Sequence, residues 1–233
     1  MGRGKAQERL VWGEAPPTPL VVQENGVPFA VRLLGARHEG LFTDMRDERI
    51  RLAGMAAGRR VLNTFAYTGS FSVVAARGGA AEVTTVDIVA KVLEWAKENF
   101  RLSGIDPGRH HFARMDTGEF LALALRRGWS WDIIVLDPPT FAVTAGRRWS
   151  LRKDYPALIG DAARVLAPGG ILWVAANTAG LQEKDLDRWI SEGSEAAGRR
   201  LRALARSGQP LDHPAPSGFP RYGYLKVRVM QDR

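Results

Sequence analysis

From residue 60 onward, short apolar runs alternate with longer segments in which apolar residues recur at helical spacing. Seven runs are predicted as strands, the last two with no helix between them: RVLNTFA, EVTTVDI, HHFARMD, WDIIVLDPP, ILWVAANT, RLRALARSG and YGYLKVRVMQ. The segments predicted as helices are 70–78, 90–104, 118–128, 155–170 and 183–200, the fourth of them stopped by Pro168-Gly169-Gly170. Near-continuous apolar strands that alternate with helices are typical of a mostly parallel sheet with helices on both faces. We therefore expect an α/β fold that binds its ligand at the carboxyl ends of the strands.

The first part of the chain has a pattern of its own. Alternating apolar residues flank Asn25-Gly26, a dipeptide that favours a two-residue hairpin turn. Thr43 or Asp44, with acidic residues soon after, is predicted to cap the start of a helix. The predicted organisation is an N-terminal extension and hairpin over residues 1–40 and a main domain over residues 41–233.

Composition narrows the function classes. The chain contains no cysteine, which excludes disulfides, thiolate metal sites and a cysteine nucleophile within these 233 residues. His110 and His111 have no carboxylate or cysteine at metal-ligand spacing, so no metal is expected. No apolar run approaches the ~18 residues of a membrane span, and residues 1–17 lack the apolar stretch of a secretory signal. A cytoplasmic location without membrane contact is the default expectation.

The charge balance points to an anionic partner. The net charge is +8, and nucleic acid is the commonest partner of such a basic chain. A general preference for arginine in the coding genome would give the same excess, so charge alone leaves both interpretations open.

The loop after the first strand of the sheet is poorly suited to a phosphate. It reads NTFAYTGSF, with a single glycine, and so lacks both the G-x-G-x-x-G spacing of dinucleotide sites and the lysine of a P-loop. Asp87 ends the next strand, where one carboxylate can accept from both hydroxyls of a ribose, although a strand-end aspartate is often only a turn residue. A nucleoside without phosphates fits better than NAD or ATP, and S-adenosylmethionine is such a ligand.

The strand WDIIVLDPP is followed by an aromatic residue, in the order LDPPTF. Asp137 and the carbonyl of Pro138 are expected to project into the crevice as acceptors, with Phe141 stacked on a planar base and Asn177 as a further partner. A D-P-P sequence elsewhere would usually be only a turn. Combined with Asp87 in an α/β sheet, it favours an S-adenosylmethionine-dependent methyltransferase.

Taken together, GLFTDMR, VLNTFAYTGSFSV, LEWAKENFRLSG, LDPPTF and LAPGGILWVAAN resemble the large-subunit ribosomal RNA methyltransferases of the RlmI and RlmK/L type. The similarity runs from Leu10 to the C-terminus and leans toward the RlmK side, which makes 7-methylguanosine. It implies a class I methyltransferase fold, a Rossmann-like sheet of seven strands with the last strand antiparallel. It also implies S-adenosylmethionine as cofactor, held by Arg46, Phe65, Ala66, Tyr67, Thr68, Gly69, Ser70, Asp87, Ile88, Asp116, Thr117 and Asp137.

Two departures from that family bear on recognition and chemistry. RlmI-type enzymes carry an N-terminal RNA-binding domain and RlmK is fused to a second methyltransferase, whereas this sequence shows neither, so we expect recognition by the core, the hairpin or a partner. Members that make 5-methylcytosine carry Ser-Cys-Ser where this chain reads Ala175-Ala176-Asn177. Because C5 methylation of a pyrimidine needs a thiolate to add to C6, we expect transfer to a base nitrogen, with guanine N7 favoured, which needs only positioning.

Basic residues follow the D-P-P turn directly, in VTAGRRWSLRKDY. Cations beside an aromatic are typical of a nucleic-acid contact, and a solvated helix start is the alternative. The predicted RNA-binding residues are Arg147, Arg148, Trp149, Arg152 and Lys153. The expected function is methylation of RNA, and the resemblance implies ribosomal RNA as the substrate. Two alternatives stay open: a methyltransferase of a small molecule or protein, and a non-catalytic RNA-binding module.

Overall fold

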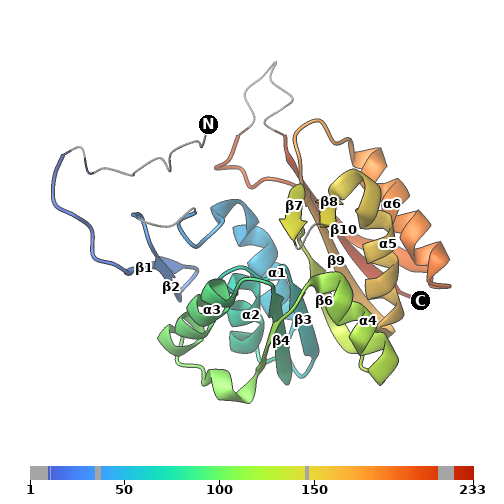
Figure 1. Ribbon diagram of the computed structural model, residues 1–233, viewed down its shortest axis with the longest axis horizontal. Coiled ribbons are helices and arrows are strands. Elements are labelled where there is room, and N and C mark those ends of the chain that lie inside the picture. The colour runs from blue at the N-terminus through green and yellow to red at the C-terminus, as the bar shows by residue number, and fades with distance from the viewer. Residues whose placement is uncertain (1–9, 11, 35–37, 145–146, 215–222) are drawn as a thin grey trace.

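The computed structural model describes residues 10, 12–34, 38–144, 147–214 and 223–233, with the side chains of 142–148 outside that description (Figure 1). Its centre is a seven-stranded sheet in the order β10-β11-β9-β6-β3-β4-β5. The strands are β3 (Arg60–Thr64), β4 (Glu82–Asp87), β5 (His111–Arg114), β6 (Trp131–Leu136), β9 (Leu166–Asn177), β10 (Leu201–Ser207) and β11 (Leu225–Asp232). Within the described residues β11 alone runs opposite to the other six strands. The predicted fold class is confirmed.

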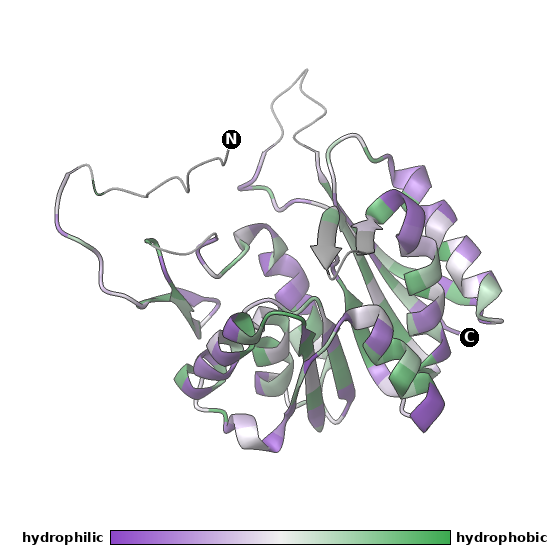
Figure 2. Cartoon of the chain, viewed as in Figure 1, coloured by the Kyte–Doolittle hydropathy of each residue, from purple (hydrophilic) through white to green (hydrophobic). Residues whose placement is uncertain are grey.

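Helices cover both faces of this sheet. They are α1 (Arg46–Met55), α2 (Ser70–Arg77) and α3 (Ala90–Leu102) on one face, and α4 (Thr117–Arg127), α5 (Leu151–Arg164) and α6 (Glu183–Ala196) on the other. Figure 2 shows mostly apolar strands between helices that carry both apolar and polar residues. None of the helices in the described part of the chain is long and apolar enough to cross a membrane.

The strands supply two separate cores because successive side chains point to opposite faces of a sheet. In β6, Ile134 packs in the core beneath α4, α5 and α6, while Ile133 packs in the core beneath α1, α2 and α3. Leu172 and Trp173 of β9 divide in the same way. A strand buried on both faces reads as a continuous apolar run, which is the pattern that predicted the sheet.

The predicted hairpin is confirmed as β1 (Leu20–Glu24) and β2 (Val27–Val31). Its turn is Asn25-Gly26, with φ of 52° and 75°, the left-handed pair that a tight hairpin turn requires. The hairpin packs on α3, where Trp95 Nε1 donates to the Ala30 carbonyl at 3.0 Å. Whether residues 1–40 and 41–233 are separate units stays a prediction.

The predicted helix over 155–170 is wrong at both ends. Helix α5 begins at Leu151 and ends at Arg164, and the Pro168-Gly169-Gly170 run lies inside β9. That run forms an irregularity in the pairing with β6, whose register shifts between Trp131 and Ile133. Between the D-P-P turn and α5 the chain forms a small hairpin that was not predicted, β7 (Phe141–Thr144) with β8 (Arg147–Ser150).

The predicted N-cap at Thr43 or Asp44 is also wrong. Residues Thr43–Met45 form a short 3-10 turn, η1, and α1 starts after it without a side-chain cap. Both candidate side chains have distant partners instead: Thr43 Oγ1 lies 3.0 Å from His213 Nε2, and Asp44 accepts from the Tyr224 hydroxyl at 2.9 Å. These side-chain oxygens therefore bind residues distant in the sequence instead of capping the helix as the local sequence pattern predicted.

Candidate active site

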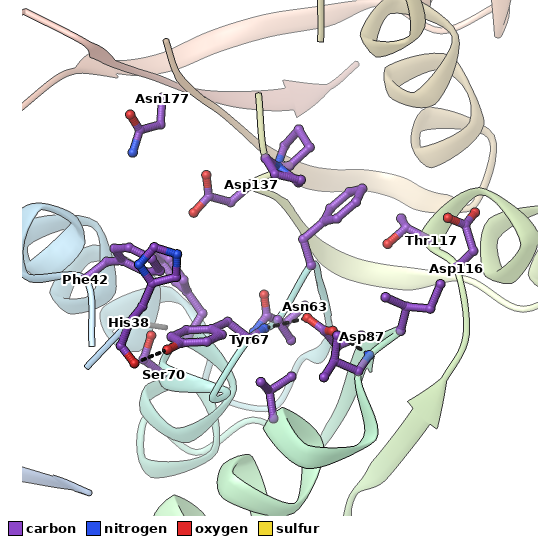
Figure 3. Close-up of a pocket in the computed structure, with 18 of the residues that line it drawn as sticks. His38, Phe42, Asn63, Tyr67, Ser70, Asp87, Asp116, Thr117, Asp137 and Asn177 are labelled. Atoms are coloured by element: carbon purple, nitrogen blue, oxygen red, sulfur yellow. Dashed lines mark hydrogen bonds between the residues drawn. The ribbon is translucent and has the colours of Figure 1, made fainter. Parts of the chain in front are cut away.

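A cavity of about 1230 Å³ lies at the carboxyl ends of β3, β4, β6 and β9 (Figure 3). The residues after β4 and β5 line one part of it, which we call the β4 side, and the residues after β6 and β9 line the other, the β6 side. Most of the predicted cofactor and catalytic residues line this cavity: Phe65, Ala66, Tyr67, Ser70, Asp87, Ile88, Asp116, Thr117, Asp137, Pro138 and Asn177.

The loop between β3 and α2 holds a strained backbone. Phe65 and Tyr67 have φ of 51° and 50°, in a region that side-chain-bearing residues rarely adopt. Such conformations cost about 1–3 kcal/mol each and persist mainly at functional sites. Gly69 has φ 74°, and a Cβ on it would lie 2.7 Å from the Cβ of Ala96 in α3. Glycine at this position lets the loop close against α3, so the loop is fixed before any ligand arrives.

Asp87 is held at the end of β4 by the backbone. Its two carboxylate oxygens accept from the amides of Tyr67 and Val89, each at 2.9 Å. The pKa of Asp87 is raised, because the effect of burial outweighs the lowering effect of these amide hydrogen bonds. Each oxygen keeps a lone pair for a further donor. The carboxylate is therefore oriented and still able to accept from the two hydroxyls of a ribose.

Asp116 caps α4 at the far end of the β4 side. Its Oδ1 accepts from the amides of Gly118 and Glu119 at 2.9 and 3.2 Å. The capping role leaves Oδ2 for a ligand, and Thr117 lies beside it on the cavity wall. Asp116 was predicted only as a ligand-binding residue, and its role as the N-cap of α4 was not predicted.

Asp137 follows β6 on the β6 side and has no hydrogen bond among the described residues. The pKa of Asp137 is raised to about 7, mainly by burial and also by the nearby charge of Asp44, while the cation of Arg49 acts to lower it. An unpaired, partly buried carboxyl group is costly to a folded chain. Because Asp137 lines the cavity, we expect a polar group of a bound ligand to be its partner.

Tyr155 fixes the backbone that carries Asp137. Its buried hydroxyl lies 3.1 Å from the Leu136 carbonyl and 2.6 Å from the Ala175 carbonyl. These carbonyls belong to β6 and β9, close to where the two strands end. The hydroxyl therefore ties together the two strand ends from which Asp137 and Asn177 extend. Nearby, Thr140 Oγ1 donates to the Asn177 carbonyl at 2.8 Å.

Four of the predicted cofactor and catalytic residues do not line the cavity. Arg46 pairs with Asp212 through two hydrogen bonds at 2.7 and 3.1 Å. The buried Thr68 side chain donates to the Gly40 carbonyl, and Gly69 packs against α3. Phe141 is 74% exposed, because the β7–β8 hairpin carries it away from the cavity.

The predicted RNA-binding residues divide between two elements. Trp149, on β8, and Lys153, in the first turn of α5, line the cavity. Arg152 is exposed on α5 outside it. The side chains of Arg147 and Arg148 lie outside the described residues. The contact that was expected on one loop is therefore spread over β8 and the start of α5.

The N-terminal part of the chain contributes cavity residues that the sequence argument missed. They are Arg32, His38, Phe42, Asp44 and Arg49. Arg49 is buried and pairs with Glu24 of β1 at 2.6 Å, which ties α1 to the hairpin. Within the run GLFTDMR only Arg46 was predicted as a site residue, and no local pattern marked the remaining residues as cavity walls.

A mostly parallel sheet of seven strands, with an antiparallel last strand and a large cavity at its carboxyl edge, is the architecture of the class I methyltransferases. A family model described as "S-adenosylmethionine-dependent methyltransferase" matches residues 5–211. The chain belongs to this family. The cofactor of the family is S-adenosylmethionine, and Asp87, with a free lone pair on each oxygen, fits its ribose.

The relatives and solved structures agree with that assignment. "Ribosomal RNA large subunit methyltransferase I" of Aeromonas salmonicida is 34% identical over 230 residues, 98% of this chain and 58% of the relative. "Ribosomal RNA large subunit methyltransferase" of Deinococcus radiodurans is 34% identical, over 96% of this chain and 54% of the relative. A chain solved in complex with SAH superposes with a TM-score of 0.89 at 30% identity, over 95% of this chain and 58% of that one. The chain thus spans little more than half the length of these proteins.

Proposed function

We propose that this chain transfers the methyl group of S-adenosylmethionine to a base of large-subunit ribosomal RNA. The observation that carries the proposal is the cavity itself, in which an oriented carboxylate, Asp87, and an unpaired one, Asp137, lie on different sides. The names of the relatives support a ribosomal RNA substrate, and so does the net charge of +8.

On the β4 side, the residues of this chain bind the cofactor. Asp87 accepts from the ribose hydroxyls, while Asp116 and Thr117 bind the adenine end. The loop from Phe65 to Ser70 surrounds the remainder, with α2 behind it. When bound, S-adenosylmethionine supplies an electrophilic methyl group on a sulfonium sulfur. A cationic group held beside Asp137 would lower the pKa of that carboxyl and favour its ionised form.

On the β6 side, Asp137, the Pro138 carbonyl and Asn177 orient the acceptor base. Methylation at guanine N7 uses a lone pair already in the ring plane, so no general base is required. The ring gains a positive charge as the N–CH3 bond forms, and the Asp137 carboxylate stabilises that charge. Positioning plus electrostatics is the mechanism that the residues allow.

The acceptor atom is the finer part of the proposal. A nitrogen acceptor follows from the absence of cysteine in all 233 residues, since C5 methylation of a pyrimidine needs a thiolate. One relative reported above is named ribosomal RNA large subunit methyltransferase I. This name does not support the predicted closer similarity to the RlmK type. Guanine N7 is therefore proposed on the chemistry of the site and the LDPPTF motif.

Labelled S-adenosylmethionine, incubated with the protein and with ribosomal RNA, total protein and metabolite fractions, tests the function. Label in ribosomal RNA, with 7-methylguanosine in the nucleoside digest, is expected. Label in another fraction alone would refute the RNA assignment. Finding 5-methylcytosine, or trapping the protein on RNA that contains 5-fluorocytosine, would refute the nitrogen assignment and the argument from cysteine.

A further inference from the structure

A half-exposed aromatic side chain on the cavity wall has no role in the site described so far. Phe42 is 46% exposed and lines the cavity. Its ring centroid lies 5.4 Å from that of Tyr67 and 5.8 Å from that of His38. Figure 3 shows these rings on the side of the cavity that lies away from Asp116. Ligand pockets are lined mainly by apolar and aromatic side chains, so a half-exposed ring on the wall of this cavity is a candidate ligand contact.

Three hydrogen bonds hold the segment that carries Phe42. The Tyr67 hydroxyl donates to the His38 carbonyl at 3.0 Å, and Thr68 Oγ1 donates to the Gly40 carbonyl at 2.5 Å. Arg49 Nη2 donates to the Phe42 carbonyl at 2.8 Å. Alternate carbonyls over residues 38–42 are thus fixed by the loop after β3 and by α1.

The same segment is pressed close to α3. Gly40 has φ 107°, and a Cβ on it would lie 2.2 Å from Trp95 Cζ2. Any side chain at position 40 would push the segment outward. The position of the Phe42 ring is therefore set in the absence of ligand, which reduces the ordering cost when a ligand binds.

The position of Phe42 favours the acceptor over the cofactor. Asp116 marks the proposed adenine end, and Phe42 lies across the cavity from it, on the far side of Tyr67 from Asp87 (Figure 3). Its neighbours on the wall include Asp44 and Arg49, the two charges that influence Asp137. The ring therefore borders the part of the cavity in which the acceptor must lie.

We propose that Phe42, backed by Tyr67, is the surface on which the acceptor base stacks, so that residues 38–42 form the base-binding subsite. The proposal rests on the proposed function and replaces Phe141, which is 74% exposed and outside the cavity. Planar bases of any sequence stack on aromatic rings, so this subsite holds the base while Asp137 and Asn177 select its polar edge.

The test is methyl transfer to ribosomal RNA at saturating S-adenosylmethionine. Phe42→Leu keeps an apolar side chain and removes the ring, and it is expected to lower kcat/KM for RNA about 10- to 100-fold. Phe42→Tyr keeps the ring and should retain most of the activity. Trp129→Leu is the matched control, because Trp129 is also 46% exposed but lies at the amino end of β6.

Calorimetry with SAH separates the base from the cofactor. The Kd of Phe42→Leu for SAH should stay within about twofold of the native value. The Tm of Phe42→Leu should stay near that of Trp129→Leu. A large loss of SAH affinity would overturn the proposal, as would equal RNA activity in Phe42→Leu and Trp129→Leu, or a greater loss in Phe141→Leu. If the native protein labels no RNA, the proposed function fails and this inference fails with it.

Discussion

The two sides of the cavity satisfy their polar groups in opposite ways. On the β4 side, Asp87 and Asp116 each accept two backbone amides. On the β6 side, Asp137 has no partner among the described residues and its pKa rises to about 7. The backbone amides orient Asp87 and Asp116 whether or not a ligand is bound, whereas Asp137 gains a hydrogen-bond partner only when a ligand supplies it. We infer that the β4 side is complete before binding and that the β6 side is completed by the acceptor.

The largest expected effect follows from removing the unpaired carboxylate. Asp137→Ala should lower the rate of methyl transfer about 100-fold, because loss of a group that positions or stabilises the reacting atoms has effects of that size. The Kd for SAH should change little. Asp132→Asn, on the same strand but at its amino end, is the control. An equal loss of methyl-transfer rate in Asp137→Ala and Asp132→Asn would contradict a specific role for Asp137 on the β6 side.

Removing the oriented carboxylate of Asp87 should instead weaken cofactor binding and leave the rate at saturating cofactor largely intact. Asp87→Ala deletes a charged acceptor, a loss of about 1.5–3 kcal/mol, or roughly 10- to 150-fold in cofactor affinity. Calorimetry with SAH measures it directly. Saturating cofactor should restore much of the rate in Asp87→Ala and none in Asp137→Ala. Unchanged SAH affinity would contradict the ribose assignment.

A smaller effect concerns stability and pH. Since the pKa of Asp137 is raised from 3.8 to about 7 in the folded chain, the folded state retains a proton that the unfolded state has lost between these values. Native stability from this group therefore falls as the pH rises from about 4 to about 7 and stays low above it.

Asp137→Asn removes that titration while keeping the shape of the side chain. We expect its Tm to exceed that of the native protein by more at pH 8 than at pH 5. The difference should reach several degrees, because 1 kcal/mol moves the midpoint of a chain this size by about 2–4 °C. A Tm difference that does not vary with pH would show that Asp137 is ionised throughout.

The smallest expected effect is electrostatic and tests the mouth of the cavity. Neutralising Arg147, Arg148, Arg152 and Lys153 together should flatten the dependence of RNA affinity on salt. Each lost phosphate contact on single-stranded RNA reduces the slope by about 0.7. SAH affinity should stay constant, since these residues are assigned to RNA alone. An unchanged slope would show that this basic cluster is only solvated.

What the sequence could predict follows the same division. The β4 side derives from one stretch, between Arg60 and Thr117, in which strand, loop and helix signals are all local. The apolar runs predicted its strands, and the final acid of β4 predicted a carboxylate at their edge. The strained loop was placed correctly, although φ values of 51° at Phe65 and 50° at Tyr67 have no sequence signal.

The β6 side could be predicted only in part. Asp137, Pro138 and Asn177 were predicted from their places at the ends of apolar strands and line the cavity, whereas the wall next to them comes from segments distant in the sequence. Phe42 and Asp44 precede β3, and Tyr224, which donates to Asp44, lies 180 positions further along the chain. The periodicity of a strand or helix contains no information about such pairings. Phe141 was assigned to stacking because it follows the D-P-P turn, and only the β7–β8 hairpin shows that it points elsewhere.

The place of β11 has a consequence for biosynthesis. This strand ends at Asp232, yet it pairs on both edges, with β9 and with β10. A nascent chain can assemble β3, β4 and β5 with their helices while the remainder is still being translated, since their contacts are close in sequence. The edge of β9 stays open until residues 225–232 have left the ribosome. Its apolar residues are a target for chaperones during that interval, and a truncation before residue 225 would extend the interval indefinitely.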